Sequence, residues 1–184
     1  ANALTDLTVN TGQGDVDLHS ITAAKLANVT VTGDNDFIFG DVGAKTSSLA
    51  SFDASASTGS ITIGELVDFV STGSVKTGTA NDDVTLSVTT EATLAVDLGE
   101  KTSDSDTLRI SGANNLGVTV FDLSAADQIL QINGVTSTGT EVGIENVNLS
   151  GLTGSQGASI TGDSGINVIT ATLNADTIVP GGGA

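Results

Sequence analysis

The sequence predicts an all-β chain whose short strands form a parallel β-helix, or β-solenoid, and three observations support this prediction. Runs rich in Val, Ile, Leu and Thr recur along the chain between Gly, Asn, Asp and Ser residues. Similar strand-and-turn segments recur 21 residues apart in the N-terminal third. Aromatic residues make up only 3% of the chain, which suits narrow coils filled by Val, Ile, Leu and Ala better than a wide globular core.

The strand signal is carried by nine short runs of three to five residues that are rich in apolar and β-branched side chains, most of them alternating with polar ones. They are Leu7–Val9, Val29–Val31, Phe37–Phe39, Ile61–Ile63, Val84–Val88, Leu94–Val96, Leu108–Ile110, Val118–Val120 and Val147–Leu149. Helix signals are limited to Ser20–Ala27 and Ser124–Leu130, where the Ser is a suitable N-cap for a helix of about two turns. We therefore expect only a small helical fraction.

The spacing of the strands favours a stacked fold. Thr11–Gly12 and Thr32–Gly33 each follow a strand-like run and lie 21 residues apart, and Val31 and Phe52 have the same separation. Coils of about 20 residues are typical of parallel β-helices, in which each coil packs its aliphatic side chains on the next. The spacing becomes irregular further along the chain. An antiparallel β-sandwich remains the alternative, since it uses the same short strands with turns about every 8–12 residues.

The charge of the chain limits its partners. The net charge is −17, from 22 acidic and 5 basic residues. Binding to nucleic acids or anionic membranes depends on Lys and Arg, so neither is expected. No apolar run approaches the roughly 20 residues needed to span a bilayer, so membrane insertion is not expected either. The acidic excess either solvates the surface or provides sites for cations.

A nine-residue repeat lies near the C-terminal end. Asn167 and Asp176 are nine residues apart, and each stands two residues before an aliphatic residue, Ile169 or Ile178. Nonapeptides of the form G-G-x-G-x-D-x-U-x wind a parallel β-structure that binds calcium in its turns. We therefore expect residues 1–160 to form a β-solenoid module and residues 161–184 to begin nonapeptide repeats that continue beyond the chain.

Several turns combine Gly with closely spaced oxygen ligands, which is the pattern expected for calcium. Calcium takes about six to eight oxygen ligands, including the backbone carbonyls that glycine turns can present. One such turn supplies about half of these ligands, so a neighbouring turn must supply the rest. The alternative is that these side chains are solvated and cap their own turns. The candidate ligands are Asp15, Asp17, Asp34, Asp36, Asp41, Asn81, Asp82, Asp83, Asp104, Asp106, Asn174 and Asp176.

The residues give little basis for catalysis, and we expect the chain not to be an enzyme. His19 is the only histidine and Cys is absent, so the spacing gives no basis for a nucleophilic triad. Trp and Tyr are also absent, which excludes the aromatic sugar platforms that these residues form. A polysaccharide lyase would combine calcium-binding carboxylates with a basic residue. The basic residues are scattered singly: Lys25, Lys45, Lys76, Lys101 and Arg109.

Four segments resemble a known family. Residues 161–182 resemble the RTX repeats of proteins exported by type I secretion. The segment Ser51–Gly59 is similar to the S-F-D-A-S-x-x-T-G segment of RTX-bearing surface-layer (S-layer) proteins of Gram-negative bacteria, and Gly78–Asp82 and Ile144–Leu152 also resemble parts of those proteins. The resemblance implies a right-handed, calcium-stabilised β-solenoid with RTX-like turns that tiles into a lattice on the outer membrane.

By this resemblance, the calcium role extends to the positions that match the acidic place of the repeat: Asp36, Asn81, Asp82, Asp176 and, with an amide, Asn167. The implied cofactor is calcium. The implied partners are copies of the chain itself and, through parts outside this chain, outer-membrane lipopolysaccharide.

The expected function is that of a structural module in a secreted, calcium-dependent surface layer that self-assembles on the cell surface. Extracellular calcium sites have dissociation constants of about 10⁻⁴–10⁻³ M, so they fill outside the cell and stay empty inside it. The alternative is the stalk or ligand-binding module of a large RTX adhesin, which would bind a glycan or surface as a monomer.

Overall fold

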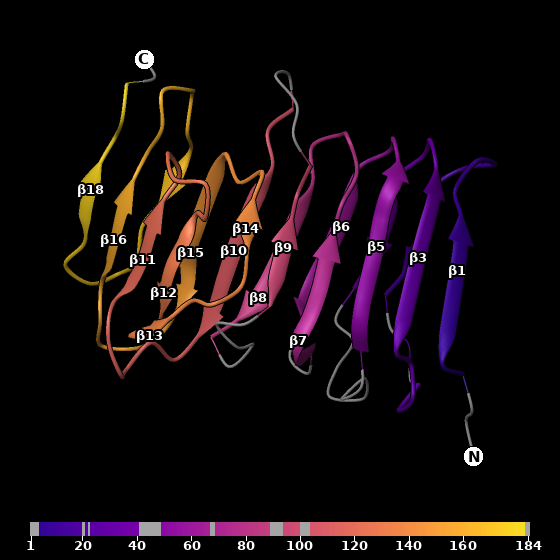
Figure 1. The fold of residues 1–184 in the computed structure, drawn as a ribbon, viewed down its shortest axis with the longest axis horizontal. Helices are drawn as coiled ribbons and strands as arrows, with labels where there is room; N and C mark the ends of the chain where they lie inside the picture. The colour runs from indigo at the N-terminus through magenta and orange to yellow at the C-terminus, as the bar shows by residue number, and fades with distance from the viewer. Residues whose placement is uncertain are drawn as a thin grey trace.

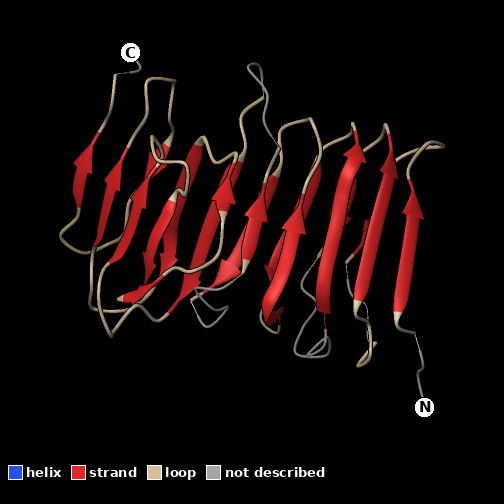
Figure 2. Cartoon of the chain, in the orientation of Figure 1, coloured by secondary structure: helices blue, strands red, loops and turns tan. Residues whose placement is uncertain are grey.

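The computed structural model describes residues 4–19, 21, 23–40, 49–66, 69–88, 94–99 and 104–182. These residues form eighteen β-strands and no helix (Figure 2), so the all-β prediction is confirmed. A membrane-spanning helix is not found among them.

The strands belong to three sheets, here called sheets A, B and C. Sheet A has the order β1 (Asp6–Asn10), β3 (Asn28–Gly33), β5 (Leu49–Ser57), β7 (Phe69–Lys76), β9 (Ala95–Asp97) and β14 (Glu141–Val142). Sheet B has the order β2 (Val16–Leu18), β4 (Phe37–Phe39), β6 (Ile61–Leu66), β8 (Asp83–Ser87), β10 (Thr107–Gly112), β15 (Asn146–Leu152) and β17 (Ile169–Thr170). Sheet C has the order β13 (Val135–Thr136), β12 (Ile129–Ile132), β11 (Thr119–Asp122), β16 (Ala158–Thr161) and β18 (Thr177–Val179).

From β1 to β10 the chain alternates between sheets A and B. Each successive pair of strands, one in each sheet, forms a layer, and the layers follow one another along the long axis, with the N- and C-termini at opposite ends (Figure 1). Every pairing within sheets A and B is parallel. Among the described strands, antiparallel pairing occurs only from β11 to β12 and from β12 to β13. The antiparallel sandwich alternative is therefore wrong.

The layers have nearly the spacing that the sequence predicts. The backbone N–H of Asp36 donates to the side chain of Asp15, across a separation |i−j| of 21. The N–H of Ser60 donates in the same way to Asp36, across a separation of 24. Successive layers therefore differ in length by a few residues, which explains why the spacing looks irregular in the sequence.

The register corrects one expected pairing in sheet A. Phe52 of β5 lies opposite Val29 of β3, rather than opposite Val31. The reason is the length of the layers: by residue number, Val29 lies 22 residues after its partner Leu7, and Phe52 lies 23 residues after its partner Val29, so neither step equals 21. An equal spacing in the sequence therefore does not identify the residues that face each other in the sheet.

Alternate residues of the strands point inward and form one core. Phe37, Phe39 and Phe52 are completely buried, with ring centroids 5.7 to 6.2 Å apart. Aliphatic residues fill the rest of the core, as the composition predicts. This burial supplies most of the favourable free energy of folding, at about 25 cal/mol for each Å² of apolar surface.

Neither expected helix is found in the described residues. Within Ser124–Leu130, the backbone N–H and the hydroxyl of Ser124 both donate to Oδ1 of Asp122, at 3.1 and 2.6 Å, and strand β12 begins at Ile129. Ser124 thus closes a tight turn instead of capping a helix. In Ser20–Ala27, Ser20 and Thr22 lie outside the described residues. Ala23 and Leu26 form a single turn, closed by the Leu26 N–H, and both are buried.

The C-terminal region adds strands to sheets B and C. Val147 of β15 lies opposite Ile169 of β17 in sheet B. In sheet C, β16 pairs with β18, and the N–H of Ala158 donates to Asp176 across a separation |i−j| of 18, which is twice the period of the nonapeptide repeat. The two copies of the repeat therefore lead into strands of different sheets.

Candidate functional site

One inward-facing position of sheet B changes from apolar to polar along the stack of layers. The backbone register aligns, in successive strands, Val16, Phe37, Ile61, Asp82, Asp106, Glu145 and Asn167. Phe37 and Ile61 are fully buried, and Asp82 and Asp106 occupy the same position with only 2% and 0% exposure. Carboxylates therefore take this position in the fourth, fifth and sixth strands of the row, and burying them is costly unless their charges are compensated.

Hydrogen bonds link these carboxylates from layer to layer. Oδ1 of Asp82 accepts the backbone N–H of Ile61, and Oδ1 of Asp106 accepts the N–H of Asp82, both at 2.7 Å. Oε2 of Glu145 accepts the N–H of Asp106, also at 2.7 Å. Each acidic side chain thus satisfies a backbone donor of the preceding layer, and the bonds hold the aligned strands in register.

Three carboxylate oxygens beside this ladder are shielded from solvent and have no hydrogen-bond partner: Oδ2 of Asp106 and both oxygens of Asp104. Burial raises the pKa of Asp106 to about 8, and the charges of Asp82, Glu145 and Asp104 add to this rise. Burial is also the main cause that raises the pKa of Asp82. The four acidic residues Asp82, Asp104, Asp106 and Glu145, here called the buried acidic cluster, therefore favour a proton or a cation among them.

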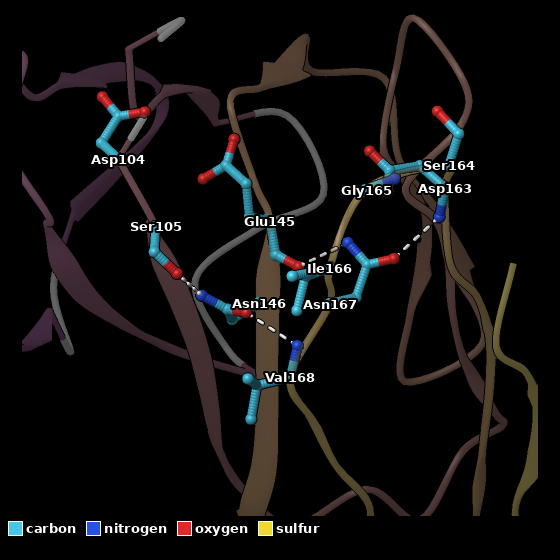
Figure 3. A pocket seen from close by; sticks show the side chains of 10 residues that line it. All are labelled: Asp104, Ser105, Glu145, Asn146, Asp163, Ser164, Gly165, Ile166, Asn167 and Val168. Atoms are coloured by element: carbon cyan, nitrogen blue, oxygen red, sulfur yellow. Dashed lines mark hydrogen bonds between the residues drawn. The ribbon is translucent and has the colours of Figure 1, made fainter. Parts of the chain in front are cut away.

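A pocket of about 570 Å³ adjoins the buried acidic cluster (Figure 3). Asp104 and Glu145 line it, and their carboxylates lie on the same side of the view. Asn146 crosses the pocket, because its Nδ2 donates to Oγ of Ser105 and its Oδ1 accepts the N–H of Val168, both at 2.7 Å. The remaining lining residues are Asp163, Ser164, Gly165, Ile166 and Asn167.

The side chains of the cluster are close enough to interact but do not surround a common point. Among the described residues, no three Asp, Glu or His side chains are arranged to hold a metal ion. Binding of an ion would therefore require the carboxylates to turn toward one another.

Three of the candidate calcium ligands form a second, more exposed column at the turns before sheet B. Oδ1 of Asp15 accepts the N–H of Asp36 at 3.1 Å, and Oδ1 of Asp36 accepts the N–H of Ser60 at 3.0 Å. Oδ1 of Asn81 accepts the N–H of Ser105 at 2.9 Å. These side chains accept hydrogen bonds from backbone N–H groups of the neighbouring layer. The carboxylates of Asp15 and Asp36 each keep a second oxygen for other contacts.

Other candidates have local partners. Asp17 lies 3.1 Å from Nε2 of His19, and Oδ1 of Asp34 accepts a hydrogen bond from Nδ2 of the adjacent Asn35. Asp83 is held by Arg109, whose Nε and Nη2 both donate to its carboxylate at 2.6 Å. Asp41 lies outside the described residues.

The C-terminal pair belongs to a separate part of the molecule, next to sheet C. Oδ1 of Asp176 accepts the N–H of Ala158 at 2.7 Å and the hydroxyl of Thr172 at 2.8 Å. Nδ2 of Asn174 donates to the carbonyls of Gly154 and Gln156. The structure therefore brings Asp82, Asp104 and Asp106 into one cluster and places the other candidates elsewhere.

Two acids of the interior were not predicted from the sequence: the half-buried Glu145 and the buried Glu141. Glu145 stands two residues before the inward-facing Val147, as Asp106 does before Leu108, so the rule used for the other candidates could have found it. Glu141 is 2% exposed, accepts the hydroxyl of Ser137 at 3.0 Å and leaves Oε2 without a partner. Burial raises the pKa of Glu141 to about 8, and its contact with Asp127 contributes.

The arrangement offers hard oxygen donors in a shielded position, which is chemistry for holding protons or hard cations. The only histidine of the chain, His19, lies beside Asp17 and not in this cluster. Comparisons with protein-family models, with curated proteins and with solved structures give no match to the chain.

Proposed function

We propose that the chain is a structural module of a secreted, calcium-dependent bacterial surface layer that assembles from copies of itself. The observation that carries this proposal is the alignment of acidic side chains in successive layers of two parallel sheets. Such an alignment repeats the same donor chemistry along one axis, as expected of a protein whose stability and assembly depend on cations.

The proposed fold behind this function is a right-handed β-solenoid with RTX-like turns. Successive strands alternate between sheets A and B, and hydrogen bonds join the turns of neighbouring layers at Asp15, Asp36 and Ser60. Stacked coils of this kind contact only their neighbours, so the stack extends in one direction. The resemblance to RTX-bearing surface-layer proteins favours the same fold.

Calcium is proposed because the acidic groups are numerous and some are buried. The net charge of −17 opposes a compact state through repulsion, and divalent cations relieve that repulsion. The uncompensated oxygens of Asp104 and Asp106 mark where neutralisation stabilises most. Sites of extracellular affinity would be filled after secretion, so calcium would order the chain outside the cell.

Self-assembly is proposed from the sheet edges and from exposed apolar side chains. Strands β1, β14, β2, β17, β13 and β18 are the edges of the three sheets in the described residues. Unpaired strand edges favour association with other chains. Leu116, Ile166 and Leu173 are 81%, 75% and 93% exposed, which adds apolar surface that a neighbouring copy would cover.

Circular dichroism combined with light scattering tests this proposal. Calcium-free chain in excess chelator is compared with the same chain in a few millimolar calcium. We expect calcium to increase strand content and to produce ordered particles visible by electron microscopy. A chain that folds with calcium but stays monomeric would favour the RTX adhesin module instead. If neither strand content nor particle size changes with calcium, both the surface-layer module and the adhesin module are contradicted.

The proposal assigns the chain no catalytic role. In this proposal, the acidic side chains accept hydrogen bonds from backbone N–H groups or bind cations. Incubation with acidic polysaccharides, in calcium, should give no depolymerisation. Release of unsaturated or reducing ends by the purified chain, and not by a matched blank, would contradict this assignment.

A further inference from the structure

We propose that Asp82, Asp104, Asp106 and Glu145 together form one buried site for a hard divalent cation of the calcium class, shared by strands β8, β10 and β15. This inference rests on the proposed function and deepens it, because it places the ion inside the stack instead of in the exposed Gly-rich turns. The four residues precede these three strands of sheet B, which are neighbours in its order.

The carboxylates of the cluster lie in neighbouring layers and act on one another. Asp82 and Asp106 are joined by a hydrogen bond from backbone to side chain, and so are Asp106 and Glu145. Asp104 is close enough for its charge to act on both Asp82 and Asp106. The charges of Asp82, Asp104 and Glu145, from three layers, thus all act on Asp106, whose side chain is completely buried. Like charges so placed repel, and a divalent cation converts that repulsion into attraction.

Three carboxylate oxygens of the cluster have no hydrogen-bond partner. Asp106 is completely buried, and its Oδ1 is used by the Asp82 N–H while its Oδ2 has no partner. Both oxygens of Asp104 are also shielded and unpaired. Buried polar atoms in folded proteins nearly always have partners, so three orphaned oxygens in one place indicate a missing ligand. A cation, a proton or a donating water molecule can satisfy these oxygens, because ionised carboxylates only accept, and of the three the cation best offsets the clustered negative charge.

A pocket connects the cluster with solvent. Asp104 and Glu145 also line the pocket of about 570 Å³, together with Asp163 (Figure 3). Three carboxylates around one opening would attract a cation from solvent. The pocket also supplies the oxygens of Ser105 and Asn146, and it has room for the water molecules that complete the coordination shell of calcium.

The other candidate calcium ligands differ from this cluster. Asp83 is neutralised by Arg109, and Asp15, Asp36 and Asp176 each have a side-chain oxygen that accepts a backbone N–H at a turn. None of these four residues has an oxygen that is both shielded and unpaired in the described structure, whereas Asp104 and Asp106 do. Within the proposed site, both oxygens of Asp82 accept backbone N–H groups, from Ile61 and Gly78, so Asp82 contributes its charge and not an unpaired oxygen. Oxygen donors without sulfur or imidazole favour calcium or magnesium over transition metals.

Isothermal titration of the calcium-free chain with calcium chloride, and separately with magnesium chloride, tests the site. The central variant is Asp104→Asn, because both oxygens of Asp104 lack hydrogen bonds and the substitution breaks none. The second variant is the double substitution Asp104→Asn with Asp106→Asn, in which the amide oxygen can still accept the Asp82 N–H. The control is Asp53→Asn on β5, an acid of sheet A that accepts hydrogen bonds from Ser55.

We expect the wild-type chain and the Asp53 variant to bind calcium with equal stoichiometry. In the Asp104 variant, the dissociation constant of the most tightly bound calcium ion should rise at least tenfold. The double variant should bind one calcium ion fewer than wild type. In chelator, the double variant should melt at a higher temperature than wild type, because two carboxyl groups with shielded, unpaired oxygens are gone. A purely structural role would change the melting temperature equally with and without calcium.

Two results would overturn the inference. If wild type and both variants give identical calcium titrations, the cluster holds protons, and calcium-dependent assembly then depends on other residues. If wild type binds no calcium at all, the inference and the calcium part of the proposed function fail together. Folding of every variant is checked by its circular dichroism spectrum. If the double variant is unfolded, the comparison of Asp104→Asn with Asp53→Asn alone decides the question.

Discussion

The carboxylate of Asp106 accepts a hydrogen bond of 2.7 Å from the backbone N–H of Asp82, which lies 24 residues earlier in the chain. Both residues are buried, so no water can replace this bond. Asp106→Ala should therefore be less stable than Asp106→Asn by about 1–3 kcal/mol, the cost of an unpaired buried donor. Urea denaturation of both variants in chelator measures the difference. Equal stabilities would show that the bond contributes nothing.

The three-ring cluster of the core should be the most sensitive apolar site. Phe52 is fully buried and packs against Phe37 and Phe39. Phe52→Ala should lower the free energy of unfolding by about 3–5 kcal/mol, and Phe52→Leu by less, since more of the volume is kept. Chemical denaturation of both variants checks the order. A loss below about 1 kcal/mol for the alanine variant would contradict the packing described.

The ion pair between Asp83 and Arg109 should contribute little despite its geometry. Two nitrogens of Arg109 donate to the Asp83 carboxylate, but the side chains are 30% and 41% exposed. A double-mutant cycle with Asp83→Asn and Arg109→Gln should give a coupling of about 0.5–1 kcal/mol, decreasing in high salt. Coupling of several kcal/mol that is insensitive to salt would mean that the pair is more shielded than the structure shows.

Glu141 should make stability fall as the pH rises. Burial raises its pKa to about 8 in the folded chain, so the folded state holds its proton more tightly than the unfolded state does. Its contribution is fully present below the ordinary pKa of 4.5 and is lost as the pH rises through about 8. Each such group gives a slope of at most about 1.4 kcal/mol per pH unit.

Glu141→Gln removes this titration and keeps a similar shape. The variant should match wild type near pH 4 and exceed its stability near pH 8, so the pH dependence of the unfolding free energy becomes flatter. Denaturation across this pH range, in chelator, measures the slope. An unchanged slope would assign the pH dependence to other acids, such as Asp106, whose pKa is also raised.

The strands were predictable because their signal is local. Alternation within runs such as Val29–Val31 and Leu108–Ile110 is set by the side chains themselves, and both runs lie in strands. Helix formation at Ser124 was a wrong prediction, because the same hydroxyl that caps helices also closes a turn with Asp122. The turn at Asn133–Gly134 was a missed signal, since both residues have the positive φ of a two-residue hairpin.

The candidate site was only partly predictable, because it depends on register. Asp82 and Asp106 were identified from their place before a strand, but nothing in the local sequence shows that they share one buried position. The same local rule also selected Asp36, whose carboxylate accepts the N–H of Ser60 at a turn. Glu145 belongs with Asp106 only once β10 and β15 are paired across 39 residues.

Thermal unfolding of the chain in excess chelator and in a few millimolar calcium tests the central claim most directly. A few millimolar calcium exceeds a dissociation constant of about 10⁻⁴ M roughly 30-fold, which would stabilise the fold by about 2 kcal/mol for each site. For a chain of this length we therefore expect the midpoint to rise by about 5 °C or more. The same midpoint in chelator and in calcium would contradict the claim that this protein depends on calcium for its folded state.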